Sequence, residues 1–391
     1  MRIILIESGP PDAAGSMNRY AALLQTALET VSGVECSRVS LAPTRPQLER
    51  IPRRLRTAFH HATIAWRARR LVRRLPADIY HVVDGSHGYI ARWLPETRTI
   101  VTAHDIIPEL QSRGRFPLPP PGKGARWIIR ASLLGVLESA HVIAVSQATR
   151  NDLVEVAGIP AERIHVVLHA VPPELLPKSA DHLPGWEERR TSPRPFLLHI
   201  GNNGFYKNRL GVVRIFDRLR RDVSIRLKLA GPPPDDSLRS LIASRGLEPQ
   251  VDFVTSPDDS VVKSLYRDAR LLLFPSLYEG FGWPPLEAMA WGCPVVCSSN
   301  GSLLEVAGTA ALVADASAEE QLAAHCLSIL QTRERADELV SIGLARVAEF
   351  SIERFRDQML NVYQLVANRQ NSVHAPATRS ILPATAVSEE R

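Results

Sequence analysis

The sequence is poor in cysteine and lacks a long uninterrupted apolar run. Its 391 residues include 4 cysteines, too few for a disulfide framework, so a reducing compartment is expected. The best candidate for a membrane helix, residues 131–146, contains Glu138 and His141 and is shorter than the roughly 18 apolar residues that a span requires. The apolar start ends at Glu7, too early for the core of a signal peptide. We therefore expect a soluble, cytoplasmic protein.

Two motifs of metal and cofactor chemistry are also missing. The chain has no Asp-x-Asp sequence, the simplest carboxylate pair for a metal on a diphosphate, and no Gly-x-Gly-x-x-Gly after a strand, which counts against a dinucleotide-dependent dehydrogenase. Cys293 and Cys297 flank a predicted strand without the second pair that zinc would need, so we interpret them as buried apolar residues. No metal site and no cofactor are predicted.

The overall composition is that of an ordinary globular protein with a net positive charge. Apolar residues make up 45% and charged residues 23% of a chain long enough for two domains, which excludes collagen-like, coiled-coil and wholly disordered proteins. The net charge of +6 suits an anionic partner such as a nucleotide, a phosphate or a membrane surface, without choosing among them.

Short apolar runs alternate with amphipathic stretches in two series, separated by a proline-rich segment. This alternation predicts two doubly wound α/β domains with parallel sheets. The predicted strands are 3–6, 79–83, 99–104, 142–146 and 164–168 in the first series, and 196–201, 225–231, 251–254, 269–276 and 293–298 in the second. The predicted organisation is a first domain over 1–172, a linker over 173–195, a second domain over 196–350, a helix over 351–367 that crosses back to the first domain, and a disordered tail over 368–391.

Residues 45–74 form the strongest local charge feature. They contain ten arginines and a single acid, Glu49, and the apolar residues among them include Leu55, Ile64 and Trp66. Such a mixture is typical of a basic amphipathic helix lying on anionic lipid, and also of a solvated helix face on a basic protein. Nucleic acid is not predicted, because no recognition motif accompanies the charge. Both interpretations of the basic run stay open.

The most informative stretch is Leu271–Val296. A buried strand comes first, and the loop that follows contains Gly280 and Gly282, where backbone can approach a ligand closely. Pro284 and Pro285 then begin a helix. The loop thus delivers backbone N–H groups and a helix N-terminus to the carboxyl edge of a parallel sheet. That edge is where α/β proteins bind ligands, and phosphate is favoured there.

Two glutamates in this stretch, Glu279 and Glu287, lie eight residues apart, one in the loop and one in the first turn of the helix. Both side chains can face the same crevice, where carboxylates accept hydrogen bonds from the hydroxyls of a sugar or a ribose. We expect the helix dipole to help keep Glu287 ionised. Taken alone, the pair also fits a simpler interpretation, in which Glu287 complements the dipole and Glu279 is solvated.

The string EGFGWPPLEAMAWGCPVV, residues 279–296, resembles the Glu–seven residues–Glu signature of retaining glycosyltransferase family 4, which has the GT-B fold of two Rossmann-like domains. The resemblance extends along almost the whole chain, and its wording is closest to mannosyltransferase-like members. The further segments that carry it are VTAHDIIPEL (101–110), VSQATRNDLVEVAGIPAERIHVV (145–167), IGNNGFYKN (200–208) and SSNGSLLEVAGTAALVAD (298–315). It implies that the second domain binds a nucleotide-sugar donor and the first binds the acceptor.

The resemblance also implies roles for the residues of the signature. Glu279 would contact the transferred sugar, together with the backbone of Phe281 and Gly282. Glu287 would hold the ribose of the donor. In the first domain, His104 directly follows a predicted strand and would help to position the transferred sugar.

The segment 200–208 resembles the phosphate loop of the family, so Gly201, Asn202, Lys207 and Asn208 are assigned to the donor site. Lys207 would neutralise the diphosphate. A fixed ammonium is the right group there, because breaking the glycosidic bond leaves negative charge on the departing diphosphate. Glu279, His104 and Lys207 are accordingly the predicted catalytic residues.

The chain departs from the family pattern in this loop. Members often carry an arginine one residue after the glycine or directly before the lysine, and here those positions hold Asn202 and Tyr206. Either Arg209 or an arginine elsewhere then supplies the second positive charge, or the phosphates are held less tightly. A second departure is His169-Ala170, where the family more often has Asn-Gly; we assign it no function.

Two more residues of the first domain enter the prediction. Gly15 lies in the loop after the first strand, where the family has a glycine loop facing the diphosphate, and it is assigned to the donor site. Asp105, beside His104, either orients the imidazole or caps the next turn. Asn18 and Tyr20 are expected in the helix that follows the loop.

We therefore predict a metal-independent, retaining hexosyltransferase. It would move a hexose, with mannose favoured, from a nucleotide-diphosphate sugar to a glycan or lipid-linked acceptor in polysaccharide biosynthesis. It would be cytoplasmic, with peripheral contact at the inner membrane face if residues 45–74 bind lipid. Two alternatives are a noncatalytic GT-B module that binds a nucleotide or glycan, and a nucleotide-sugar epimerase of GT-B fold.

Overall fold

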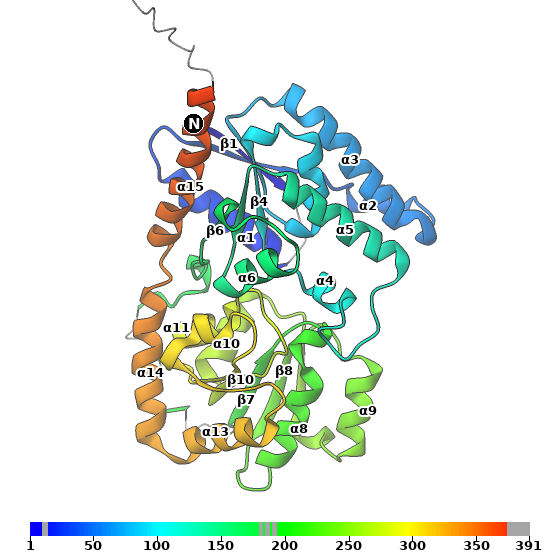
Figure 1. Cartoon of the computed structure of the whole chain (residues 1–391). Coiled ribbons are helices and arrows are strands. Elements are labelled where there is room, and N and C mark those ends of the chain that lie inside the picture. The colour runs from blue at the N-terminus through cyan, green and yellow to red at the C-terminus, as the bar shows by residue number, and fades with distance from the viewer. Residues whose placement is uncertain (10–14, 180–182, 184–187, 190–193, 374–391) are drawn as a thin grey trace, which may run out of the picture.

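The computed structural model describes residues 1–9, 15–179, 183, 188–189 and 194–373. It contains two six-stranded parallel sheets, one in each half of the chain, each flanked by helices (Figure 1). The first sheet has the order β2-β1-β3-β4-β5-β6, and the second has the order β12-β11-β10-β7-β8-β9. The prediction of two doubly wound α/β domains is confirmed.

The strands are short and central ones are buried on both faces, as parallel sheets require. The first sheet consists of β1 (Arg2–Glu7), β2 (Glu35–Ser40), β3 (Ile79–Val82), β4 (Thr99–Ala103), β5 (His141–Ala144) and β6 (Ile164–Val166). The second consists of β7 (Phe196–Ile200), β8 (Arg226–Gly231), β9 (Val251–Thr255), β10 (Leu271–Phe274), β11 (Val295–Ser298) and β12 (Leu312–Ala314).

Helices connect these strands. In the first half they are α1 (Ser16–Glu29), α2 (Arg45–Glu49), α3 (Arg56–Arg74), α4 (Ile107–Ser112), α5 (Lys123–Glu138) and α6 (Gln147–Glu155), with the 3-10 segment η2 (Gly85–Trp93). The second half has η7 (Phe205–Lys207), α8 (Arg209–Leu219), α9 (Asp236–Ser244), α10 (Asp259–Asp268), α11 (Trp283–Ala290), α12 (Leu303–Ala307), α13 (Glu319–Gln331), α14 (Arg333–Ala348) and α15 (Ile352–Val373). Over the described ranges, every helix is too short or too polar to cross a membrane.

Two strands of the sheets, β2 and β12, were not predicted from the sequence. Both lie at the edge of a sheet. The residues of β2 are exposed or only partly buried, and β12 has three residues. Edge strands of this kind carry little of the continuous apolar pattern that identifies a buried parallel strand, which explains the omission.

The strand order fixes where each half can bind a ligand. In the second sheet, β7 and β10 are neighbours although they are not consecutive, so the chain leaves them toward opposite sides. Loops at the carboxyl ends of such a pair open a crevice at the sheet edge, the usual ligand site of doubly wound proteins. In the first sheet, β1 and β3 form the corresponding pair. The loops after these four strands therefore enclose the candidate sites.

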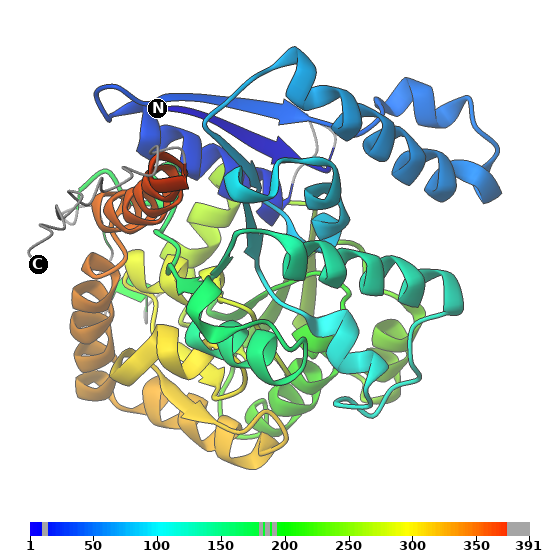
Figure 2. The same cartoon turned by 45° about the horizontal axis from the view of Figure 1, so that its top comes forward.

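The last helix, α15, runs from the second half of the molecule back to the first half, as Figures 1 and 2 show. Its Tyr363 contacts the first sheet, where the Tyr363 hydroxyl lies 2.7 Å from Nδ1 of His81 in β3. The predicted end of this helix at residue 367 is wrong, because the helix continues to Val373 and includes the start of the expected tail. The rest of that tail, 374–391, and residues 180–182, 184–187 and 190–193 of the expected linker lie outside the described residues.

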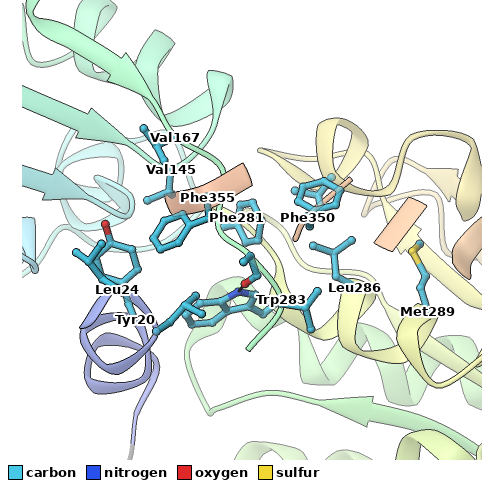
Figure 3. Close-up of a cluster of buried hydrophobic side chains, with 14 of the residues drawn as sticks. Tyr20, Leu24, Val145, Val167, Phe281, Trp283, Leu286, Met289, Phe350 and Phe355 are labelled. Atoms are coloured by element: carbon cyan, nitrogen blue, oxygen red, sulfur yellow. Dashed lines mark hydrogen bonds between the residues drawn. The ribbon is translucent and has the colours of Figure 1, made fainter. Parts of the chain in front are cut away.

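A large buried cluster joins the two halves. Figure 3 shows Tyr20 and Val145 of the first half meeting Phe281 and Trp283 of the second, with Phe355 of α15 packed between them. Each of these side chains is at most 9% exposed. Because a core of this kind is continuous across the domain boundary, the loops of the two sheets are held face to face.

His81, which contacts Tyr363 of α15, is expected to make the stability of the protein depend on pH. The imidazole is fully buried, with the Tyr363 hydroxyl on one ring nitrogen and the Thr102 hydroxyl 2.7 Å from the other. Burial lowers the pKa of His81 to about 3, whereas an unfolded histidine titrates near ~6.5. Between these two values the unfolded chain binds one more proton than the folded chain, so stability falls as pH falls, by about 1.4 kcal/mol per pH unit.

We expect the free energy of unfolding to fall less steeply in His81→Gln than in the wild type. Between about pH 6.5 and about pH 5, the His81 contribution amounts to about 2 kcal/mol. Urea unfolding at the two pH values measures it, and the other buried histidines cancel in the comparison. Equal pH dependence in the two proteins would show that His81 takes up its proton without unfolding.

Candidate active site

Lys207 and Glu279 meet at the carboxyl edge of the second sheet. Lys207 ends the 3-10 turn η7 after β7, and Glu279 lies in the loop after β10. The Lys207 ammonium lies 2.8 and 2.9 Å from the two carboxylate oxygens of Glu279. Both side chains are largely buried, with exposed fractions of 14% and 8%. Two of the three predicted catalytic residues thus form one ion pair.

The loop that carries Lys207 is built for close approach. A Cβ atom on Gly201 would lie 3.3 Å from Cγ of Lys207, so glycine leaves room for the lysine stem. Asn208 adopts a left-handed backbone conformation with φ of 53°. Its amide N–H donates to the Pro275 carbonyl at 2.9 Å, and its side-chain oxygen caps α8 by accepting from the Gly211 N–H at 3.1 Å. Asn208 therefore fastens the Lys207 loop to the Glu279 loop.

Asn202, also predicted to bind the donor, is exposed and bonded within its own loop. Its side-chain oxygen accepts from the Gly204 N–H at 2.8 Å, and its amide donates to the Tyr206 hydroxyl at 3.2 Å. These two residues occupy the positions where the sequence lacks an arginine. The contacts shape the loop without bringing a positive charge to it.

Glu287 is buried in α11 at 4% exposure, but the prediction that it lies in the first turn is wrong, because the helix begins at Trp283 and its first turn contains no acidic residue. The Tyr266 hydroxyl donates to its Oε2 at 2.7 Å, and Nη1 of Arg19 lies 3.9 Å from its Oε1. Burial raises the pKa of Glu287, and the bond from Tyr266 and the charge of Arg19 oppose that rise. The expectation that the helix dipole keeps this group ionised needs correction, since burial dominates and side-chain partners offset it.

His104 directly follows β4, and its ring lies against those of Tyr20 and His169. Its Nε2 lies 2.8 Å from the Val83 carbonyl, which can only accept, so Nε2 carries the proton. Burial lowers the pKa of His104, and the nearby charge of Asp84 opposes the shift. The imidazole is therefore neutral at pH 7, and Nδ1 is its hydrogen-bond acceptor.

Asp105 caps the next turn rather than orienting the imidazole. Its Oδ1 accepts from the backbone N–H of Ile107 at 2.9 Å. Burial raises the pKa of Asp105 to about 6, against the effect of that bond, and the charge of Glu279 raises it further. The carboxylates of Glu279, in the second domain, and Asp105, in the first, therefore repel each other across the domain boundary.

The loop around Glu279 touches the His104 segment directly. A Cβ atom on Gly280 would lie 1.8 Å from the His104 carbonyl oxygen, so only glycine fits. The Thr149 hydroxyl lies 3.3 Å from the carbonyl oxygens of both residues. Next in the loop, Phe281 points into the shared core and Gly282, with φ of 104°, begins α11. All three predicted catalytic residues thus come from segments that meet at the domain boundary.

His169 is a residue that the sequence analysis left without a role. Its ring centroid lies 4.7 Å from that of Phe281, 5.0 Å from that of Trp283 and 5.3 Å from that of His104. The Trp283 indole N–H donates to the carbonyl of the next residue, Ala170, at 3.0 Å. His169-Ala170 therefore packs the end of the first domain against the signature loop. Only the departure from Asn-Gly marked it in the sequence.

A second crevice lies at the carboxyl edge of the first sheet, between the loops after β1 and β3. It encloses about 340 Å³ and is bordered by Gly15, Ser8, Asp84 and His87, among others. The Asp84 carboxylate accepts from the Ser8 hydroxyl at 2.9 Å and lies 3.2 Å from Nδ1 of His87. Burial acts to raise the pKa of Asp84, but the bonds from His87 and Ser86 outweigh it and lower the pKa. Gly15 thus borders the crevice of the first sheet.

Metal ligation has no evident place in the described ranges. There, no three His, Cys, Asp or Glu side chains cluster in a way that would hold a metal ion. Cys293 and Cys297 are both buried with free thiols, and burial raises the pKa of each.

Comparison with known proteins identifies the family. Residues 17–175 match the model for Glycosyltransferase Family 4, and residues 186–345 match the model for Glycosyl transferases group 1. The O-antigen chain mannosyltransferase B of Escherichia coli is 33% identical over 298 residues, which is 74% of each chain. The MMP alpha-(1->4)-mannosyltransferase of Mycolicibacterium hassiacum is 29% identical over 57% of this chain and 54% of its own.

Solved structures show the same fold. The sucrose-phosphate synthase of Thermosynechococcus elongatus superposes with a TM-score of 0.76 over 94% of this chain and 99% of its own, at 21% identity. WaaG, a glycosyltransferase involved in lipopolysaccharide biosynthesis, superposes with a TM-score of 0.68 over 93% of this chain and 99% of its own, at 14% identity. The chain is a GT-B glycosyltransferase of family 4, similar to its mannosyltransferase members.

Proposed function

We propose that this glycosyltransferase moves a hexose, with mannose favoured, from a nucleoside-diphosphate sugar to a glycan or lipid-linked acceptor, with retention at the anomeric carbon and without a metal. The ion pair between Lys207 and Glu279, at the switch point of the second sheet and beside Glu287, carries the proposal. It sets an ammonium for phosphate next to carboxylates that accept sugar and ribose hydroxyls. The names of the relatives support a mannosyl donor and polysaccharide biosynthesis.

In this proposal the bond between the anomeric carbon and the diphosphate oxygen breaks, and its electron pair stays on that oxygen. Lys207 stabilises the charge that develops there. An acceptor hydroxyl attacks from the face that the diphosphate leaves, and its proton passes to the departing phosphate. Glu279 and Nδ1 of His104 accept hydrogen bonds from sugar hydroxyls and hold the ring in place. The crevice of the first sheet, with Asp84 and His87, would receive the acceptor.

The test is a donor screen on the purified full chain. GDP-, UDP- and ADP-hexoses are offered with and without EDTA, and donor hydrolysis and thermal stabilisation are recorded for each. We expect one nucleotide class to stabilise the protein and its sugar to be released with retained configuration, unaffected by EDTA. Stabilisation without turnover would favour the noncatalytic module, and conversion of the sugar within the intact donor would favour the epimerase. Loss of turnover with EDTA would refute metal independence.

We also propose peripheral contact with an anionic membrane through the first domain, at the cytoplasmic face. The basic run 45–74 folds into α2 and α3, and α3 leaves Trp66 52% exposed beside the Arg70 guanidinium, 4.0 Å from the ring centroid. On α5, Trp127 and Leu134 are 72% and 42% exposed. Figures 1 and 2 show α3 and α5 along the same side of the first domain. Exposed aromatic rings among arginines suit the boundary between lipid headgroups and acyl chains.

We expect the wild type to cosediment with phosphatidylglycerol vesicles at low salt and not with phosphatidylcholine vesicles. Replacing Trp66 and Trp127 together with alanine should weaken the partition about tenfold or more, because both rings insert at the interface. Leu304→Ala is the matched control, since Leu304 is 51% exposed on the second domain. Absence of the wild type from anionic vesicles would leave the arginines as a solvated face.

A further inference from the structure

The carboxylates around the signature glutamates outnumber the nearby cations, so a bound diphosphate needs a further positive charge there. Glu279 and Glu287 flank the donor crevice with exposed side-chain fractions of 8% and 5%, and Asp259 begins α10 beside them. Lys207 contributes one positive charge against these three carboxylates. A departing nucleoside diphosphate adds further negative charge, which a site with net negative charge would repel. The phosphate loop itself, with Asn202 and Tyr206, supplies no second cation.

Arg19 brings that cation from the other domain. It lies on α1, in the turn that begins after Gly15, and its backbone N–H donates to the Gly15 carbonyl at 3.1 Å. The guanidinium reaches across the boundary, with Nη2 2.5 Å from Oδ1 of Asp259 and Nη1 3.9 Å from Oε1 of Glu287. Its side chain is 30% exposed, so it remains accessible at the crevice. In the described part of the chain, the ion pairs of Glu279 and Glu287 involve Lys207 and Arg19.

Arg209, the arginine nearest to Lys207 in the sequence, is engaged elsewhere. It lies in the first turn of α8, is 6% exposed, and donates through Nη1 to the Asn203 side chain and to the Pro232 carbonyl, the latter at 3.3 Å. These partners belong to the outer part of the loop and to the end of β8. Arg209 therefore contacts the loop through Nη1 alone, and its buried Nε and Nη2 have no hydrogen-bond partner among the described residues. None of the ion pairs found there links it to the signature glutamates.

We propose that Arg19 is a donor-binding residue contributed by the first domain, and that its guanidinium, which lies against Asp259 and Glu287 in the structure, pairs with the diphosphate of the donor. The inference rests on the proposed function and deepens it. It makes the donor site complete only when the two domains are together. Glu287, no longer paired with Arg19, then accepts hydrogen bonds from the ribose hydroxyls. A planar guanidinium suits phosphate because it donates two parallel hydrogen bonds.

The alternative to phosphate binding is that Arg19 has a purely structural role. If Arg19 only ties α1 to α10, then removing either partner of its bond to Asp259 has the same consequence. If Arg19 binds phosphate, removing Asp259 frees it for the ligand, and only the loss of Arg19 weakens binding. The pair Arg19→Gln and Asp259→Asn therefore distinguishes the two roles.

The experiment uses isothermal titration of the full chain with ADP, GDP and UDP, and with the matching nucleosides by competition. For the diphosphate that the wild type binds, we expect Arg19→Gln to raise Kd tenfold or more and to change nucleoside binding less than twofold. Arg19→Lys should recover part of the loss, since it keeps the charge. Asp259→Asn should bind the diphosphate as tightly as the wild type or more tightly.

Arg267→Ala is the matched control, because Arg267 is an exposed arginine of α10 paired with Asp268 at 2.7 Å. It should bind as the wild type does. A change of less than twofold in Arg19→Gln, or equal weakening in Arg19→Gln and Asp259→Asn, would overturn the inference and leave the proposed function standing. Failure of the wild type to bind any of the three diphosphates would instead overturn the proposed function, and this inference with it.

Discussion

Replacing Lys207 with methionine is expected to lower kcat for sugar transfer by about 10²–10³-fold, because the charge on the departing diphosphate loses its closest fixed partner. The same change should also weaken binding of the free nucleoside diphosphate. Methionine keeps the length and much of the packing of the lysine stem against Gly201 while removing the ammonium. Single-turnover kinetics and titration with the diphosphate measure the two effects.

Stability must be followed in the same variant. Lys207→Met leaves the Glu279 carboxylate buried without its partner, which costs about 3–5 kcal/mol for a buried pair that loses one member. The double variant Lys207→Met with Glu279→Gln removes both charges and should recover stability but not turnover. Lys263→Met is the control, since Lys263 is a partly exposed lysine of α10 whose ammonium donates to the Glu174 carbonyl at 3.1 Å. Wild-type turnover in the Lys207 variant would mean that other groups hold the phosphates.

The meeting of Lys207 and Glu279 follows from sequence order once the sheet is known to be doubly wound. Strand β10 is apolar throughout, β7 is apolar except for His199, and both are buried almost along their full length, so their positions are readily predicted from the sequence. The loops after them must then flank one crevice. The local signals at Gly201, Gly280 and Gly282 agree with that placement, because each marks a close approach that the structure contains.

The contacts between domains could not be predicted in the same way. In the sequence, nothing distinguishes Arg19 from any other arginine of a helix. Its contact with Asp259 depends on how the two sheets pack together. His169 likewise gains its place among Phe281 and Trp283 only from that packing. Periodicity and capping rules describe contacts within an element, so a partner 240 residues away leaves no signal in them.

The environment of Glu287 shows where a correct local pattern gives an incomplete electrostatic picture. Its place near the start of a helix is visible in the sequence, although the helix begins at Trp283, one turn earlier than Glu287, which weakens the effect of the dipole. Its burial and the bond from Tyr266, a residue of α10, come from tertiary packing. Desolvation at 4% exposure raises the pKa of Glu287, and the bond from Tyr266 and the charge of Arg19 oppose that rise.

Replacing Glu279 with glutamine is expected to reduce transfer at least a hundredfold while leaving nucleoside diphosphate binding intact or tighter. The carboxylate that would hold the transferred sugar is lost, and a charged hydrogen bond made in the transition state is worth several kcal/mol. Lys207, no longer engaged at 2.8 and 2.9 Å by Glu279, becomes fully available to the phosphates. Turnover of the donor and titration with its free diphosphate should therefore change in opposite directions.

These opposite changes would distinguish the role of Glu279 from that of Lys207, because loss of Lys207 should reduce both turnover and diphosphate affinity. Glu320→Gln is the matched control, because Glu320 is an exposed carboxylate of α13 that pairs with Arg218 at 3.1 Å. A Glu279→Gln protein that loses diphosphate affinity in step with turnover would show that the carboxylate serves only to position Lys207. One that transfers sugar at the wild-type rate would remove Glu279 from the reaction, and the sugar would then have to be held from the His104 side of the cleft.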